Sequence, residues 1–136
     1  MSRSRWSLLV LVAPAVLSLT ACGRLFPPPP PEGEPVALSK AQASATWTDR
    51  WGGTLELRPD GTYTADRACA DDRRESGSGT WSQERADEMG GDRITVEYGT
   101  AFTSYETLRR GGTLKLWVWI GDPDDGELCV LAAPAR

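Results

Sequence analysis

The stretch "TLELRPDGTYTAD", residues 54–66, decides the fold class because it specifies a β-hairpin by itself. Leu55 and Leu57 alternate with charged residues, which is the two-residue period of a half-buried strand. Pro59-Asp60-Gly61 follows as a turn, since proline fixes φ and glycine accepts a positive φ. A three-residue loop pairs Leu57 with Tyr63. The apolar side chains of both strands then share one face, namely Leu55, Leu57, Tyr63 and Ala65.

The rest of the chain continues in short strands separated by turns. Alternating or apolar stretches predict further strands at residues 45–51, 80–84, 93–98, 101–110, 113–120 and 127–133. Charged and glycine-rich stretches predict loops at residues 67–79 and 85–92, and a "GDPDDG" turn at residues 121–126. Seven or eight such strands indicate an all-β fold, an antiparallel meander that closes into a small barrel, with a sandwich as the alternative.

The N-terminal end has the layout of a secretory signal. Two arginines precede an apolar run at residues 8–19, which is shorter than the roughly 20 residues of a membrane-spanning helix. The run ends in Leu19-Thr20-Ala21-Cys22, which resembles a bacterial lipobox. That resemblance implies a diacylglyceryl group on the Cys22 thiol and cleavage before Cys22, and two acyl chains give a stable membrane anchor. An ordinary signal with a chance cysteine is the alternative.

Three segments are therefore predicted along the chain. They are a signal peptide at residues 1–21, a lipid-anchored proline-rich linker at residues 22–45 and a β-barrel domain at residues 46–136. The linker contains five consecutive prolines at residues 27–31, which favour the extended polyproline II conformation. Such a segment predicts a spacer that holds the barrel away from the cell membrane, on its extracytoplasmic face.

The cysteines agree with an extracytoplasmic protein. If Cys22 carries the lipid, Cys69 and Cys129 remain as an even pair in a secreted chain, which predicts one disulfide. Closing a loop of about 60 residues contributes about 4 kcal/mol in the chain-entropy model. Two free thiols are the alternative, whereas a redox pair normally has a Cys-x-x-Cys spacing that this chain lacks.

Composition excludes several classes of function. Without residues 1–21, 13 basic residues remain against 19 acidic ones, a net charge of −6 that argues against nucleic acid as a partner. The chain has no histidine, which excludes Ser-His-Asp and Cys-His nucleophiles and histidine-ligated metals. The acidic stretch at residues 122–127 is one residue short of a helix-loop-helix calcium site and is better explained as a turn. No catalytic residue, metal or cofactor is predicted.

The strand "LKLWVWI", residues 114–120, is apolar on both faces. One face carries Leu114, Leu116, Val118 and Ile120, and the other carries Lys115, Trp117 and Trp119. We expect the aliphatic face to point into the barrel, because the Leu57–Tyr63 hairpin needs aliphatic partners. Trp117 and Trp119 then form a candidate outer patch that binds a ligand or an envelope partner. In the alternative, the tryptophan face is the barrel interior or is covered by residues 46–51.

The turn after this strand predicts its cross-strand neighbours. The expected pairs are Ile120 with Leu128, Val118 with Val130, Trp119 with Cys129 and Trp117 with Leu131. This register places a disulfide at Cys129 on the outer side or rim of the barrel, whereas the parity of Cys69 favours the inner side. Trp47 or Trp51 is expected to cover part of the tryptophan face.

The order of these motifs resembles a group of small actinobacterial lipoproteins whose function is uncharacterised. The shared motifs are the hairpin at residues 53–63, "GTW" at residues 79–81 and "GDPD" at residues 121–124. More distantly, residues 45–131 look like bacterial lipocalin-like and calycin-like domains. The resemblance implies a barrel and carries over no catalytic residue.

These features together predict a membrane-anchored envelope lipoprotein that acts as a non-enzymatic binding or accessory module. Its partners are the membrane, through Cys22, and an envelope protein or a small apolar ligand. One alternative is an inhibitor of a cell-wall hydrolase or protease that presents the loop at residues 67–79. Another is a lipocalin-like carrier of a small apolar molecule, which requires an enclosed cavity on the order of several hundred Å³.

Overall fold

The structure is a computed structural model that describes residues 29–69, 77–85, 90–122 and 127–135. The elements of this part of the chain are β1 (Glu34–Pro35), α1 (Lys40–Ala43), β2 (Thr46–Asp49), β3 (Thr54–Leu57), β4 (Thr62–Asp66), β5 (Gly77–Arg85), β6 (Asp92–Tyr98), β7 (Ala101–Arg110), β8 (Thr113–Ile120) and β9 (Glu127–Ala132). Strands make up 61% and helix 4% of the structure, which confirms the predicted all-β class.

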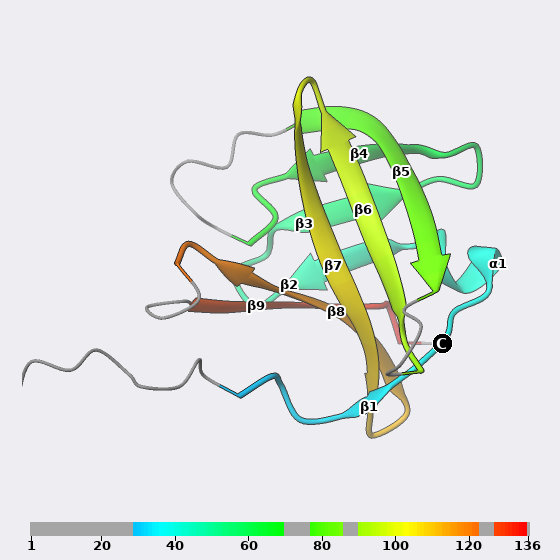
Figure 1. The fold of residues 1–136 in the computed structure, drawn as a ribbon, viewed down its shortest axis with the longest axis vertical. Coiled ribbons are helices and arrows are strands. Elements are labelled where there is room, and N and C mark those ends of the chain that lie inside the picture. The colour runs from blue at the N-terminus through cyan, green and yellow to red at the C-terminus, as the bar shows by residue number, and fades with distance from the viewer. Residues whose placement is uncertain (1–28, 70–76, 86–89, 123–126, 136) are drawn as a thin grey trace, which may run out of the picture.

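Eight of the strands form a closed antiparallel barrel, and β1 is added outside it (Figure 1). β2 to β9 pair with one another in chain order, as a meander does. The barrel closes because β2 also pairs with β9, through Thr48 opposite Ala132 and Asp49 opposite Leu131. Closure removes the sheet edges that an open meander would leave. The structure is therefore the predicted small barrel and not the alternative sandwich.

The β3–β4 hairpin has the predicted register. Leu57 pairs with Tyr63, and the Arg58 amide donates to the Thr62 carbonyl oxygen at 2.9 Å. Gly61 closes the turn with a φ of +86°, a left-handed conformation that costs residues with a Cβ about 1–2 kcal/mol. The four apolar side chains of the hairpin belong to the core cluster or pack against it. This hairpin is specified by its own residues.

Side chains fill the interior of the barrel. The largest fully buried ones are Trp47, Leu55, Leu57, Ile94, Leu116, Leu131, Cys69 and Cys129. Trp47 pairs with Leu55, and directly opposite residues share a face, so its ring points inward. Its indole Nε1 donates to the Ala43 carbonyl oxygen at 3.0 Å. The prediction that Trp47 covers the tryptophans of β8 from outside is therefore wrong.

β5 begins at Gly77, inside the segment predicted as a loop. Its first residues pair with β4 and its later residues with β6, and Thr80 belongs to both ladders. Gly79 lies at this change of partner, where a Cβ would collide with the Glu97 carbonyl oxygen. The glycines that suggest a loop instead permit a close approach of two strands at a corner of the barrel.

The predicted linker ends earlier than residue 45, because the chain is folded onto the barrel from residue 34. β1 pairs with β7. α1 starts at the Ser39 cap, which forms a capping box with Gln42. Leu38 and Ala43 are 6% and 0% exposed and belong to the core cluster. A few apolar residues in a stretch dominated by proline, alanine and serine are thus enough to dock this segment.

A buried carboxylate holds the docked segment in place. Asp92 is 2% exposed, and its Oδ2 accepts from the Leu38 amide and from Gln83 Nε2, both at 2.7 Å. The buried Thr107 hydroxyl accepts from the Asp92 amide at 2.7 Å and donates to the Val36 carbonyl oxygen at 2.6 Å. These bonds satisfy polar groups that would otherwise be buried without partners.

The β8–β9 hairpin has a register one residue away from the predicted one. Val118 pairs with Cys129, and Trp119 pairs with Leu128, so the expected Trp119–Cys129 pair is wrong. A shift of one residue moves every side chain of a strand to the other face. Cys129 therefore points inward and forms the predicted disulfide with Cys69, with 5.5 Å between their Cα atoms. The disulfide is confirmed, but it lies in the core and not on the outer side.

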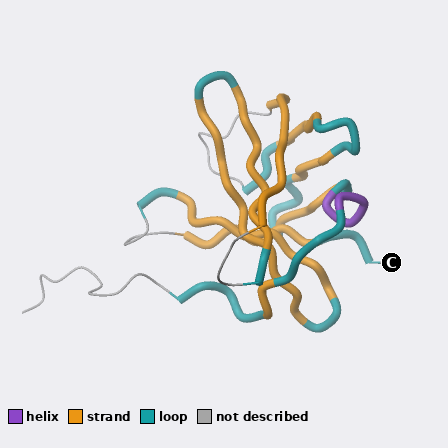
Figure 2. The backbone as a smooth tube through the Cα atoms, turned by 45° about the vertical axis from the view of Figure 1, so that its right-hand side comes forward, coloured by secondary structure: helices purple, strands orange, loops and turns teal. Residues whose placement is uncertain are grey.

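Two hairpins of the barrel diverge at their tips. The β7–β8 ladder ends at the pair Glu106–Trp117, although β7 starts at Ala101 and β8 continues to Ile120. The β6–β7 and β8–β9 hairpins consequently point in different directions in both views (Figures 1 and 2). The last residues of β8 pair with β9 alone.

Candidate functional site

The outer face of the β8–β9 hairpin carries an apolar strip. Trp117 lies opposite Val130, and Trp119 lies opposite Leu128. Residues directly opposite one another in an antiparallel pair project from the same face. We call these four side chains the outer strip; each is half-buried.

The strip faces outward because the side chains on the other face of β8 pack in the core. Leu116 is fully buried, and Leu114, Val118 and Ile120 pack against the core cluster. The structure thus places the aliphatic face inside and Trp117 and Trp119 outside, as expected from the sequence. The two indole rings stack edge to face, with centroids 5.9 Å apart and planes at 84°.

Strand divergence leaves one end of the strip open. Trp119 lies two residues beyond Trp117, the last residue of β8 that pairs with β7. Trp51 is the second side chain expected to cover the tryptophans, and it is 42% exposed. The centroid of its ring lies 4.1 Å from the guanidinium carbon of Arg50, its neighbour in the chain. The paired rings and the two aliphatic side chains of β9 therefore bury one another only in part.

Ion pairs lie beside the strip. Glu106, opposite Trp117, bonds Arg93 at 3.0 Å, and Glu127, at the start of β9, bonds Arg50 at 2.7 Å. An apolar centre with a charged rim is the usual layout of a surface that binds another protein. The strip therefore has the apolar and charged composition of such a surface.

A second buried carboxylate lies beneath this hairpin. Asp49 is 6% exposed, and its Oδ1 accepts from the Trp51 and Gly53 amides, both at 2.8 Å, while its Oδ2 accepts from the Cys69 amide. It lies close to the sulfurs of Cys69 and Cys129. These sulfurs are bonded to each other, so they are not thiolate ligands for a metal. Asp49 instead fixes the backbone on which the disulfide sits.

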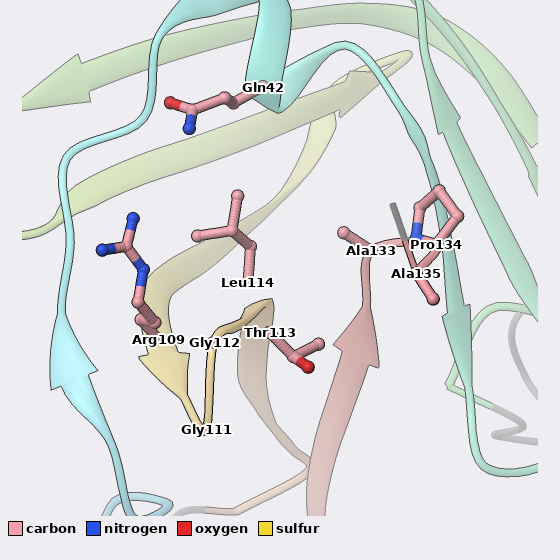
Figure 3. Close-up of a pocket in the computed structure, with 9 residues that line it drawn as sticks. All are labelled: Gln42, Arg109, Gly111, Gly112, Thr113, Leu114, Ala133, Pro134 and Ala135. Atoms are coloured by element: carbon pink, nitrogen blue, oxygen red, sulfur yellow. The ribbon is translucent and has the colours of Figure 1, made fainter.

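A groove of about 520 Å³ lies at the other end of β8 (Figure 3). Leu114 lies in its middle, Arg109 and Gln42 lie on one side, and Ala133 and Pro134 lie on the other. The sequence gives no signal for this groove, because its walls come from α1, the β7–β8 turn and the end of β9, which only the fold brings together.

Comparisons with protein-family models, with curated proteins and with solved structures find no match to this chain. The resemblance to small actinobacterial lipoproteins therefore stays a prediction.

Other predicted features lie outside the described residues. They are the signal peptide, the lipidation site Cys22 and residues 70–76 of the loop assigned to an inhibitor. Within the described part of the chain, no helix has the length and apolarity needed to cross a membrane.

Proposed function

We propose that this protein is a lipid-anchored, non-enzymatic binding module of the cell envelope, and that its outer strip binds an envelope protein. The observation that carries the proposal is the half-buried Trp117–Trp119 pair, which lies on the outside of a barrel that already has a complete core. Aromatic side chains with aliphatic neighbours and a charged rim are enriched where proteins associate.

The filled interior favours this function over a lipocalin-like carrier. Trp47, Leu116 and Leu131 are 0% exposed to solvent, and they belong to one core cluster that also contains the disulfide. A carrier of an apolar molecule needs an interior volume that these side chains take up. The outer strip is an apolar feature of the surface that remains for a partner.

The anchor completes the proposal. Lipidation of Cys22 would place the barrel at the membrane surface, and the prolines at residues 27–31 would set its distance from that surface. The variant Cys22→Ser is expected to leave the membrane fraction, and membrane retention with unchanged processing would contradict the anchor. This test does not depend on the strip.

Crosslinking in cells that produce the full-length chain tests the strip. We expect the wild-type chain to form a discrete crosslinked adduct in the envelope. The amount of this adduct should be at least about fivefold lower for the variant Trp119→Thr, since aromatic anchors dominate interface energies. Threonine keeps the strand propensity of the position. Phe102→Thr is the control, because it removes an exposed aromatic side chain outside the strip and its charged rim.

Retention of the adduct by Phe102→Thr and its loss from Trp119→Thr support the proposal. Equal adducts from both variants, or no discrete adduct from the wild-type chain, contradict it. Near-ultraviolet circular dichroism of both variants checks that the barrel is intact.

A further inference from the structure

The groove at the start of β8 is distinct from the outer strip at the end of the same strand. Its floor is the half-buried Leu114, which packs against the core, and Ala133 and Pro134 form an apolar wall (Figure 3). The opposite wall carries the polar ends of Gln42 and Arg109. The groove therefore has one polar side and one apolar side.

Gln42 directs its Nε2 group toward the groove (Figure 3). Its Oε1 already accepts from the Ser39 amide at 2.8 Å in the capping box of α1. A glutamine side chain has one carbonyl oxygen and one NH₂ group. The capping bond fixes the side chain and leaves the Nε2 hydrogens for a ligand.

Arg109 differs from the other arginines of the described residues. The other six each have a carboxylate oxygen within 3.9 Å, in the pairs Arg50–Glu127, Arg58–Glu56, Arg67–Asp66, Arg85–Asp92, Arg93–Glu106 and Arg110–Glu32. No carboxylate of the described residues lies within ion-pair distance of Arg109. Glu34 is its neighbour across the β1–β7 ladder, yet the two side chains do not bond.

This arrangement selects a particular ligand chemistry. A guanidinium group and an amide NH₂ on one wall call for a planar acceptor group, and a carboxylate matches the guanidinium fork. The apolar floor and far wall call for a hydrocarbon chain attached to it. The volume of about 520 Å³ is that of a small-molecule site.

We propose that the groove binds a free aliphatic carboxylate, whose oxygens accept from Arg109 and Gln42 while its chain packs on Leu114 and Pro134. The carboxyl terminus of a peptide offers the same chemistry from another source. This inference does not rest on the proposed function of the strip, because it concerns different residues at the other end of β8.

The test uses octanoate as the probe on the full-length chain, below its micelle concentration. Nitrogen–proton correlation spectra report binding at the amides of Gly111 and Gly112, which line the groove. The comparison ligands are 1-octanol, which lacks the charge, and an N-acetylated dipeptide ending in leucine. Local amides are used so that binding to the apolar N-terminal residues is not scored.

We expect saturable shifts with octanoate and binding weakened about tenfold by Arg109→Gln, as for a lost charge-assisted bond. Arg110→Gln is the matched control, because Arg110 bonds Glu32 at 2.8 Å and does not line the groove; its affinity should stay within about twofold. Glu34→Gln removes a nearby negative charge that repels a carboxylate ligand, and it should tighten binding. Unchanged spectra elsewhere show that each variant is folded.

Three results would overturn the inference. They are equal shifts with octanol and octanoate, equal weakening by Arg109→Gln and Arg110→Gln, and tighter binding of the dipeptide than of octanoate. The last result would assign the groove to a peptide carboxyl terminus and not to a free acid.

Discussion

The β3–β4 and β8–β9 hairpins reach a defined register by different means. In β3–β4 the three turn residues and the strict alternation of the strands fix the pairing locally. In β8–β9 the connection at residues 121–126 is longer, and β8 is apolar on both faces, so alternation does not choose a face. The choice there depends on contacts beyond the turn, namely the buried pair Leu116–Leu131 and the disulfide from Cys129 to the distant Cys69.

The difference explains which hairpin can be predicted. A register determined by neighbouring residues is visible in the sequence, whereas one determined by a contact 60 residues away is not. It also has a functional consequence, because Cys129 is held in the core by its disulfide, and the register of β8–β9 then decides which face of β8 points outward. The two hairpins should therefore respond differently when the disulfide, Asp49, Gly61 or Tyr63 is changed.

Removing the disulfide should affect β8–β9 far more than β3–β4. The variant Cys69→Ala/Cys129→Ala is expected to lower the free energy of unfolding by about 4 kcal/mol, because the unfolded chain is no longer constrained. Hydrogen exchange also reports local opening, and the β8–β9 amides should lose more protection than the β3–β4 amides because β9 loses its covalent link to residue 69. Equal loss in both hairpins would mean that the disulfide does not hold β8–β9 in particular.

Asp49→Ala tests the support beneath the disulfide. The substitution leaves the Trp51, Gly53 and Cys69 amides without their acceptor. Urea unfolding should show a loss of about 2–3 kcal/mol, the cost of buried unsatisfied donors. The control is the exposed Asp66, whose replacement by alanine should change stability by less than about 0.5 kcal/mol. Similar losses from both variants would show that burial of Asp49 is not what matters.

Gly61→Ala tests the locally determined hairpin. Its φ of +86° should make alanine cost about 1–2 kcal/mol in thermal unfolding. Gly61→Asn should recover part of that loss, because asparagine tolerates the left-handed region better than alanine does. If the two variants are equally stable, backbone conformation is not the reason for glycine at this turn.

Alkaline pH should lower the free energy of unfolding through Tyr63 of the same hairpin, by less than Gly61→Ala does. Burial raises the pKa of the Tyr63 phenol above its ordinary value of 10.0, with a further contribution from the charge of Tyr98. The phenol ionises first in the unfolded chain, so its stabilising contribution is complete below pH 10 and is lost as the pH rises above that value. The free energy of unfolding should fall less steeply in this range for Tyr63→Phe. If the free energy of unfolding falls equally steeply with pH in the wild-type chain and in Tyr63→Phe, the raised pKa of Tyr63 is contradicted.

Much of the architecture can be read from the sequence, but not its tertiary details. The all-β class, the β3–β4 hairpin and the cysteine pair follow from alternation, turn chemistry and an even thiol count. Docking of residues 34–45 does not, because a proline-rich composition conceals the two core residues Leu38 and Ala43. The β5 start at Gly77 is likewise hidden, since glycine indicates a loop unless the closeness of Glu97 is known.

The candidate sites also differ in how far the sequence predicts them. Trp117 and Trp119 can be singled out because they share one face of an unusually apolar strand. The carboxylates of Asp49 and Asp92 cannot, because nothing in the sequence separates two buried acids from the solvated ones. The groove beside Arg109 depends on which arginines find carboxylate partners, and only the folded chain determines that.

The register of β8–β9 is the most direct test of this account, because the outer strip exists only if that register is correct. Nuclear Overhauser contacts across the hairpin measure it in the folded, oxidised protein. The account predicts cross-strand backbone contacts between Val118 and Cys129 and between Trp119 and Leu128. Because the disulfide holds Cys129 in the core, contacts between Trp119 and Cys129 instead would place the tryptophans on the inner face and remove the proposed binding surface.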